Sequence, residues 1–418
     1  MRYVQLDSLR GLAACTVVIC HAANILPAIY DDPHRAWWLT ETPLSIFLSG
    51  HAAVDFFFVL SGFVLVLPFL KGPVSYPAFV FRRACRIWIP YIIAMVVAVA
   101  CAIWFYPTPI PGLSEWANRP VTFPGRQSAL NHFLLVGVFA NGEYNPVIRS
   151  LVYEMRVSLV FPLLVLMLKL GPWWRVLVAA IALSASQLVV ERLPFWHGEQ
   201  DLPMTLNYAG LFVLGMLLAR DMPGLQALYG RLSTATCALL WLLAVVCYTH
   251  QAWLFPHSRL QHLPFYRDGL TAAGASLFII FALSPSRFSA WLQSRPLVFL
   301  GKTSYSVYLY HAVILLSLVH VFYGKVPLWL LWAATGLLTV GVATASYHLV
   351  EAPAIRMGKI FRLGRKRQAL QPVNLSTDGD PASPTALLNV DPGVHRMPAI
   401  QPASLLAPES AASDASAP

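Results

Sequence analysis

The chain has 418 residues, of which 57% are hydrophobic and only 11% are charged, and its formal net charge is +10. Soluble globular domains are about 25% charged, so this composition excludes an ordinary soluble domain and indicates a chain that crosses a membrane many times. The positive charge is not accompanied by any nucleic-acid-binding motif, so we expect no nucleic-acid partner.

Ten apolar stretches follow one another along the sequence, each close in length to the about 17–25 residues that cross a bilayer core. They lie at about residues 8–29, 51–70, 85–106, 149–170, 173–190, 205–220, 232–249, 268–284, 299–322 and 327–349. We therefore predict an all-α fold, a polytopic transmembrane helical bundle formed by residues 1–355. Ten spans place both termini on one side, and the loops on that side carry most of the Lys and Arg residues, which predicts cytoplasmic termini. The predicted location is the cytoplasmic (inner) membrane.

The last part of the chain has a different composition. It is basic from residue 356 and, from about residue 368, rich in Pro, Ala, Ser and Asp. Such a sequence buries too little apolar surface to fold. We predict that residues 356–418 form a cytoplasmic tail that is basic at first and disordered from about residue 368, and that no second catalytic domain is present.

The first apolar stretch contains two ionisable residues, Arg10 and His21, eleven positions apart. That separation is about three helical turns, so both side chains lie on the same face of a helix. Ionisable residues inside a membrane span are costly and usually mark a site of chemistry or transport. We interpret His21 as a catalytic base and Arg10, near the cytoplasmic end, as a phosphate ligand. In the structural alternative, Arg10 anchors the helix at the membrane surface and His21 hydrogen-bonds a neighbouring helix.

Two acidic residues are the other catalytic candidates, Asp55 in the second stretch and Glu154 in the fourth. We expect Asp55 at the depth of His21, where a carboxylate would fix the imidazole tautomer and leave the other ring nitrogen as a base. His51 lies one helical turn before Asp55 and competes for that role. Glu154 is expected in the outer part of the membrane, where it either holds an acceptor hydroxyl or pairs with an arginine of its own segment. For Asp55 too, a purely structural hydrogen-bonding role stays open.

A basic pair, Arg83 and Arg86, lies between the second and third stretches. The two residues are three apart, so they share a face of the helix that enters the membrane, where guanidinium groups suit bidentate contact with phosphate oxygens. Basic residues at a cytoplasmic helix end also act as simple anchors, which is the structural alternative. We expect no bound cofactor and no metal, because the sequence has no Gly-rich phosphate loop and no Cys or His spacing typical of zinc.

Polar residues form a stripe along the ninth stretch, at Ser304, Tyr308 and His311. Such a stripe lines a cavity more readily than it faces lipid. In the fourth stretch, Ser150 lies one turn before Glu154 and shares its face. We predict that these serine, tyrosine and histidine side chains bind substrate.

Taken together, these segments resemble the membrane-bound acyltransferase 3 family. The motifs that carry the resemblance are an arginine and a histidine with ten residues between them in the first span, here Arg10 and His21, and an Arg-x-x-Arg pair after the second, here Arg83 and Arg86. Residues 54–63, 150–154, 304–311 and 350–353 also match, so the resemblance covers about residues 3–355. The sequence departs from the family just before Val54, where a glycine would be expected.

The resemblance implies transfer of an acyl group, commonly acetyl from cytoplasmic acetyl-coenzyme A, to a hydroxyl of a surface or exported saccharide or of a lipid-linked or antibiotic molecule. Acyl-coenzyme A would be the donor co-substrate, held by the three arginines, and a saccharide or lipid-linked glycan would be the acceptor. His21, oriented by Asp55 or Glu154, would take the proton of the acceptor hydroxyl. Some family members carry an added extracytoplasmic hydrolase-like domain, which we do not expect here.

Two other functions stay open on the sequence alone. A transporter of an acylated glycan or lipid would use the same ionisable residues as a proton or substrate path. It would consume no acyl-coenzyme A, and the spans lack the inverted halves that many secondary transporters show. The other alternative is an acyltransferase that acts on a small secreted metabolite.

Overall fold

The apolar stretches form the helices of an all-α bundle in the computed structural model of the chain, as predicted. The structure describes residues 3–105, 108–118, 125–137, 144–190, 192–193, 201–253 and 263–368. The helices are α1 (Val4–Asn24), α2 (Pro33–Thr40), α3 (Gly50–Leu70), α4 (Tyr76–Phe105), α5 (Arg126–Leu134), α6 (Ile148–Leu166), α7 (Trp173–Val190), α8 (Asp201–Tyr229), α9 (Thr234–Trp253), α10 (Pro264–Leu283), α11 (Arg287–Leu292), α12 (Arg295–Phe322), α13 (Leu328–Ser346) and α14 (Ala352–Gln368). A π-helical turn, Tyr347–Glu351, joins α13 to α14.

Nine helical segments within the described ranges are long and apolar enough to cross a membrane, and they coincide with nine of the ten predicted stretches. The remaining stretch, at about 232–249, lies in α9, where the apolar run Thr234–His250 is shorter. The whole of α9 has 20 residues, which make a helix about 30 Å long. The chain is therefore a multi-pass membrane protein, and the cytoplasmic placement of its termini stays a prediction.

Proline and capping residues fix where several helices begin. Pro33 occupies the first turn of α2, where a missing N–H costs nothing. The side chain of Asp32 caps the same helix by accepting a hydrogen bond from the backbone N–H of Arg35 (2.8 Å). This bond to the ionised carboxylate is the main cause that lowers the pKa of Asp32.

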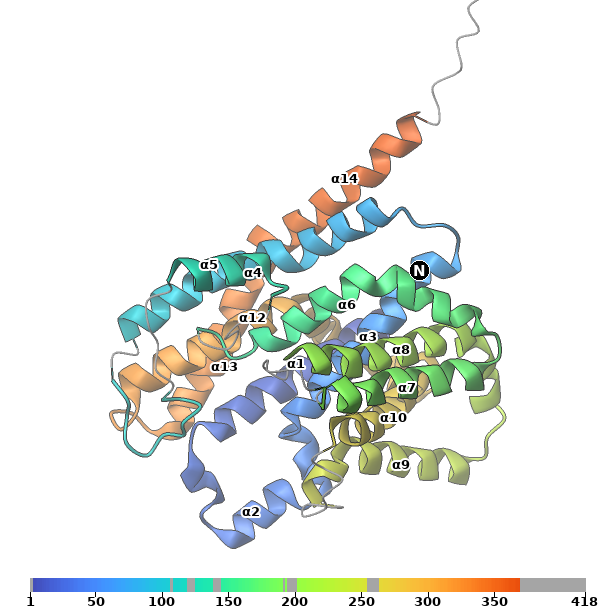
Figure 1. Cartoon of the computed structure of the whole chain (residues 1–418). Helices are drawn as coiled ribbons and strands as arrows, with labels where there is room; N and C mark the ends of the chain where they lie inside the picture. The colour runs from blue at the N-terminus through green and yellow to red at the C-terminus, as the bar shows by residue number, and fades with distance from the viewer. Residues whose placement is uncertain are drawn as a thin grey trace, which may run out of the picture. The chain divides into compact units, whose positions relative to one another are not determined.

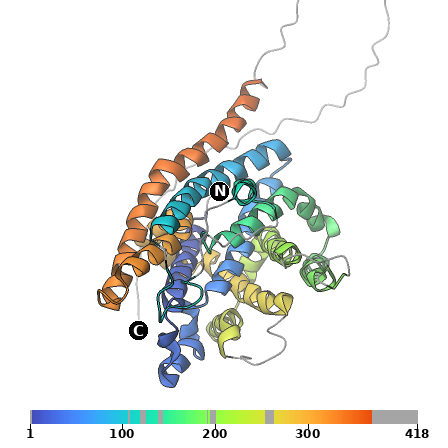
Figure 2. The same cartoon turned by 60° about the vertical axis from the view of Figure 1, so that its left-hand side comes forward.

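The inner helix of the bundle is α3, which packs against α1, α8 and α10 (Figure 1). Its Phe58 lies against two aromatic rings of α8, Tyr208 and Phe212, with ring centroids 4.2 Å and 5.9 Å away. On another side of the bundle, α14 runs beside α4 in both views (Figures 1 and 2). The basic start of the predicted tail belongs to α14, which continues to Gln368. Residues 369–418 lie outside the described residues, so the disorder predicted for them stays a prediction.

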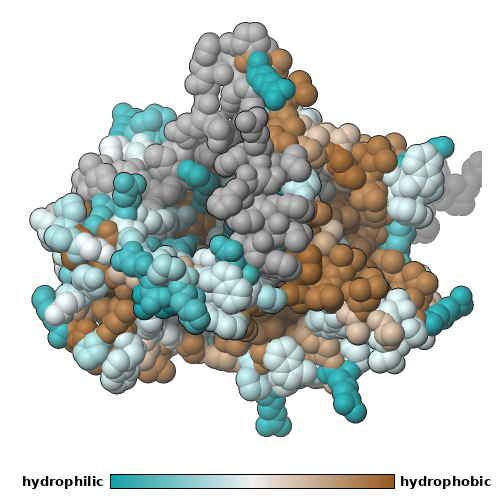
Figure 3. Space-filling view, turned by 90° about the horizontal axis from the view of Figure 1, so that it is seen from below, coloured by the Kyte–Doolittle hydropathy of each residue, from teal (hydrophilic) through white to brown (hydrophobic). Residues whose placement is uncertain are grey.

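Large apolar side chains also cover much of the outer surface. Figure 3 shows a broad hydrophobic area, in brown, with hydrophilic residues beyond it at the edges of the view. Trp104, Leu337 and Leu349 are among the most exposed of these side chains, at 76–80% of their full accessible surface. A soluble protein rarely exposes contiguous apolar surface of this kind, whereas lipid solvates it.

A contact between two glycines brings α1 and α12 together. A Cβ atom on Gly11 would lie 2.7 Å from the backbone nitrogen of Gly301, and one on Gly301 would overlap the backbone of Asp7. The two helices run in the same direction, because Arg10 reaches Ser304 and His21, further along α1, reaches His311. This is the relative direction that ten successive crossings give to the first and ninth spans.

We expect Gly301→Ala to destabilise the bundle by about 1–3 kcal/mol, because the added methyl group must push α1 away from α12. Gly336→Ala in α13 is the matched control, since no atom lies within 4 Å of a Cβ at that position. There, alanine should be neutral or stabilising, because it is the better helix former by about 1 kcal/mol. Thermal unfolding of both variants purified in detergent measures the difference. Equal stability of the two would show that the close approach of α1 and α12 is dispensable.

Candidate functional site

A cavity of about 670 Å³ lies between α3, α4, α6 and α12, and we call it the basic cavity. Among the described residues that line it, six are cationic and Glu154 is the one acid. The cationic residues are Arg10, Lys71, Arg82, Arg83, Arg86 and Lys359. Its volume falls within the about 300–1,000 Å³ of small-molecule sites, and its charge suits an anionic ligand.

Arg83 is held by two side chains of α6. Its Nη2 donates to Oε1 of Glu154 (2.7 Å) and its Nε donates to Oγ of Ser158 (3.0 Å), both on α6. Ser61 of α3 donates to the same glutamate oxygen (3.2 Å). Glu154 thus pairs with a predicted phosphate ligand on another helix, and not with an arginine of its own segment.

The sequence predicts Glu154 in the outer part of the membrane and Arg83 on the cytoplasmic side, whereas the structure brings the two side chains into contact. The chain before α6 folds into the bundle, where Nδ2 of Asn145 donates to the carbonyl oxygen of Leu309 in the middle of α12 (2.9 Å). Because α6 begins inside the bundle, its second turn reaches the level of Arg83. Membrane depth counted from the start of an apolar stretch misses such an inward fold.

The predicted phosphate ligand of α1 also lies in the basic cavity. Arg10 donates from Nε to Oγ of Ser304 (3.2 Å) and from Nη2 to Oδ1 of Asp7 (2.8 Å). Ser304 is buried on α12, so this contact turns the guanidinium inward from the helix that carries it. Arg10 and Arg83, which lie on different helices, therefore line one cavity.

A second cavity, of about 580 Å³, is lined by His21, His51, Trp116 and Arg149 among others, and we call it the histidine cavity. Three residues line both cavities, namely Val54, Ser150 and Tyr308. The hydroxyl oxygens of Ser150 and Tyr308 lie 2.7 Å apart and form a hydrogen bond between α6 and α12. The two cavities therefore share a wall made of these side chains.

The predicted base, His21, pairs with a second histidine. Its Nδ1 lies 3.0 Å from Nε2 of His311, and the indole ring of Trp116 lies 4.8 Å from its ring centroid. His311 is fully buried, and its Nδ1 lies 3.0 Å from the carbonyl oxygen of Val307, which accepts only. In the neutral pair, His311 therefore carries its proton on Nδ1, His21 donates its own Nδ1 proton to His311, and Nε2 of His21 is unprotonated.

Neither carboxylate predicted to orient His21 does so. Asp55 lies on the face of α3 that meets α10, where its Oδ2 is 3.7 Å from Nε2 of His51. The competing interaction with His51 thus prevails, although at a distance too long for a good hydrogen bond. Of the predicted site residues, Asp55, His21 and His311 do not line the basic cavity. The others do.

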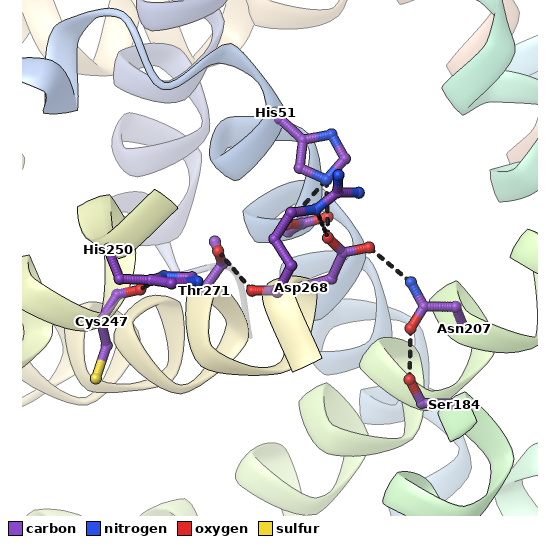
Figure 4. Close-up of polar contacts among 9 residues, drawn as sticks. His51, Ser184, Asn207, Cys247, His250, Asp268 and Thr271 are labelled. Carbon is purple, nitrogen blue, oxygen red and sulfur yellow. Dashed lines mark hydrogen bonds and ion pairs between the residues drawn. The ribbon is translucent and has the colours of Figure 1, made fainter. Parts of the chain in front are cut away.

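A polar network that the sequence did not single out continues from His51 (Figure 4). Nε2 of His51 lies 2.8 Å from Oδ1 of Asp268, which also accepts from Nε of Arg267 (2.8 Å). Oδ2 of Asp268 accepts from Nδ2 of Asn207 (2.6 Å), whose Oδ1 accepts from Ser184. The signal that could have found Asp268 is the one that found Asp55, an acid that opens an apolar stretch.

Comparison with known proteins identifies the family of the chain. The model of the acyltransferase 3 family, described as an acyltransferase domain, matches residues 3–348. The chain belongs to the acyltransferase 3 family. It is therefore an acyltransferase of the membrane, which sets aside the transporter alternative.

Individual relatives in this family are distant. Nodulation protein 10 of Rhizobium leguminosarum bv. viciae is 24% identical over 371 residues, which cover 84% of this chain and 93% of that protein. A protein of Staphylococcus aureus strain COL, named as a candidate O-acetyltransferase, is 24% identical over 391 residues, 86% of this chain but only 58% of the relative. The O-acetyltransferase OatA of S. aureus strain MRSA252 is 37% identical over 100 residues, 23% of this chain and 16% of OatA. No solved structure matches the chain.

We expect Glu154→Gln to lower the stability of the protein by about 1–3 kcal/mol, because the buried guanidinium of Arg83 loses its charged partner. Asp221→Asn is the matched control, since Asp221 pairs with Arg220 at a site where its side chain is 36% exposed. Such a pair contributes about 0–1 kcal/mol. Thermal unfolding of both variants in the same detergent compares them. A Glu154→Gln protein no less stable than the control would show that Arg83 needs no carboxylate.

Proposed function

We propose that the protein is an O-acyltransferase, an O-acetyltransferase by preference, that moves an acyl group from cytoplasmic acyl-coenzyme A to a hydroxyl of a surface or exported saccharide. The observation that carries the proposal is the shared wall of Val54, Ser150 and Tyr308, with a basic cavity on one side and His21 on the other. A donor and an acceptor that enter from opposite sides would meet at this wall.

The basic cavity suits the donor. Coenzyme A carries its phosphates at one end and its thioester at the other, so the cations would hold the phosphates while the arm extends toward Ser150 and Tyr308. Arg10, Arg83 and Arg86 are the phosphate ligands that the sequence predicts, and all three line the cavity. Lys71 and Lys359 line it as well, which adds positive charge at its edge. The positive-inside rule places this edge at the cytoplasmic face, where acyl-coenzyme A is found.

His21 suits the role of general base. With its Nδ1 proton donated to His311, the imidazole presents an unprotonated Nε2 that can accept a proton. The acceptor oxygen would attack the thioester carbonyl carbon as His21 takes the hydroxyl proton. The C–S bond then breaks, and the proton passes from His21 to the departing thiolate, so that the ester and free coenzyme A are the products. No net proton is released in this cycle.

The histidine cavity suits a hydroxyl-rich acceptor. Aromatic side chains with polar tips line it, among them Trp116, Tyr153 and Tyr208, and such residues combine an apolar face with a hydrogen-bonding group. Relatives named for O-acetyl transfer favour a hydroxyl acceptor. We therefore propose that a saccharide or lipid-linked glycan binds in this cavity. We also propose that the protein lies in the cytoplasmic (inner) membrane, with both termini of the chain in the cytoplasm.

We expect His21→Ala to lower the rate of acyl transfer by about 10²–10⁴, the usual contribution of a positioned general base. His34→Ala is the matched control, because His34 is an exposed histidine of α2. The rate is measured as coenzyme A released from acetyl-coenzyme A by membranes that contain the acceptor glycan. Mass spectrometry of the envelope glycan, or of secreted metabolites, then identifies which molecule gains the acetyl group. Transfer at the native rate by a normally expressed His21→Ala protein would rule out the role of His21.

We expect Arg86→Gln to raise KM for acetyl-coenzyme A about tenfold or more, since a charge-assisted contact with phosphate contributes roughly 1.5–3 kcal/mol. The matched control is Arg175→Gln, because Arg175 stacks on Trp174 at the start of α7 and does not line the basic cavity.

The face at which the donor binds is tested with sealed vesicles of both orientations, in which the donor reaches only one face. Activity is expected only where the cytoplasmic face is outward. Equal activity with donor added to either face would contradict the proposed sidedness.

A further inference from the structure

The side chain of Asp55 is the least satisfied ionisable group among the described residues of the bundle. It has no solvent exposure, and neither carboxylate oxygen has a hydrogen-bond partner. The nearest charged or ionisable contact is Nε2 of His51 at 3.7 Å. An ionised carboxylate buried without donors costs several kcal/mol, so either a proton or a neighbouring cation must neutralise it.

Asp55 belongs to a set of three potential metal ligands. His51 and Asp55 are one helical turn apart on α3, and Asp268 approaches them from α10 (Figure 4). One donor atom from each of the three lies within 4.8 Å of the others. A four-coordinate ion bound at about 2.0–2.2 Å holds its ligand atoms roughly 3–4 Å apart, so small side-chain rotations would bring all three onto one ion.

The surroundings of Asp268 are those of a supported metal ligand. Asn207 donates to its Oδ2 and is itself held by Ser184, while Arg267 donates to its Oδ1. Such outer hydrogen bonds orient the carboxylates of metal sites and are typical of them. The side chain of His51 is 37% exposed and lines the histidine cavity, which supplies both an entry path and an open coordination position.

The charges around the site also suit a cation. With both carboxyl groups ionised and His51 neutral, Asp55 and Asp268 outweigh the guanidinium of Arg267, and the cluster would carry a net charge of −1. A proton on Asp55 itself would remove this charge but leave both of its oxygens without a hydrogen-bond partner. A proton on His51 would neutralise this charge. However, the hydrogen on Nε2 is directed at Asp268, 2.8 Å away, so Asp55 would still lack a donor. An ion between the three side chains would satisfy both the charge and Asp55.

We propose that His51, Asp55 and Asp268 bind one Zn²⁺ ion, with the fourth position open to the histidine cavity. One imidazole and two carboxylates form a ligand set that suits zinc, and three protein ligands with an open position are typical of zinc sites that contact a substrate. The ion would bind an oxygen of the acceptor beside His21. That role rests on the proposed function, whereas binding of the metal does not.

The test is a zinc titration of the full-length protein, purified in detergent and stripped with a chelator, against a fluorescent zinc indicator. We expect one ion per wild-type chain and an affinity lower by at least about tenfold for Asp55→Asn, because loss of a ligand costs no less than loss of an outer hydrogen bond. Asp221→Asn, which changes a carboxylate paired with Arg220, is the matched control and should bind as the wild type does. Without metal, Asp55→Asn should be at least as stable as the wild type, so that weaker binding is not unfolding.

Three results would overturn the inference. They are an absence of saturable binding by the wild type, equal affinity of Asp55→Asn, and preference of the site for Mg²⁺ over Zn²⁺. Absence of binding together with higher stability of Asp55→Asn would identify Asp55 as a buried acid that a proton alone neutralises. His21→Ala should retain zinc while it loses transfer, so failure of the metal site and failure of the proposed function give different results.

Discussion

The parallel contact of α1 with α12 is the constraint on which the rest of the site depends. Because Gly11 and Gly301 have no side chains, the two backbones approach until polar groups on both helices meet. Arg10 then reaches Ser304 at one level and His21 reaches His311 at another. Along α1, the eleven residues from Arg10 to His21 span roughly 16 Å. This fixed length separates the guanidinium of the basic cavity from the imidazole of the histidine cavity, and so defines how far a donor must extend to be used.

Charges inside the bundle tie together helices that are distant in the sequence. Arg83 of α4 is held by Glu154 of α6, and Asp268 of α10 is held by His51 of α3. A charge without a partner is costly at this depth, so these contacts position the helices as well as the side chains. The ion pair of Glu154 with Arg83 also affects donor binding, because the proposed donor needs the same guanidinium group. Phosphates that enter the basic cavity must compete with this carboxylate for Arg83, and phosphate, with its higher charge, is the stronger ligand.

Local patterns in the sequence predicted those features that depend on local physics. A bilayer requires a run of apolar residues, so nine of the ten predicted stretches coincide with helices that are long and apolar enough to cross it. The three-residue spacing of Arg83 and Arg86 puts both on one helix face, and both line the basic cavity. Partners across helices could not be predicted in this way. His51 and Asp268 are 217 residues apart, and the face of α3 that meets α1 is set by packing. The sequence therefore favours His21 beside Asp55, whereas the structure has the competing residue His51 there. Inward folding of the chain before α6 likewise has no local signal, and it moved Glu154 to the level of Arg83.

The two histidines that line the histidine cavity, His21 and His51, have different hydrogen-bonding and charged neighbours. His21 forms a hydrogen bond with His311. The Nδ1 proton of His311 is already donated to a backbone carbonyl. In the proposed cycle, His21 passes the proton that it takes from the acceptor to the departing thiolate. His51 lies between two carboxyl groups, those of Asp55 and Asp268, and this set of side chains suits a bound cation. A transient proton carrier and a fixed cation site need these opposite environments, and α1 and α3 supply one of each to the same cavity.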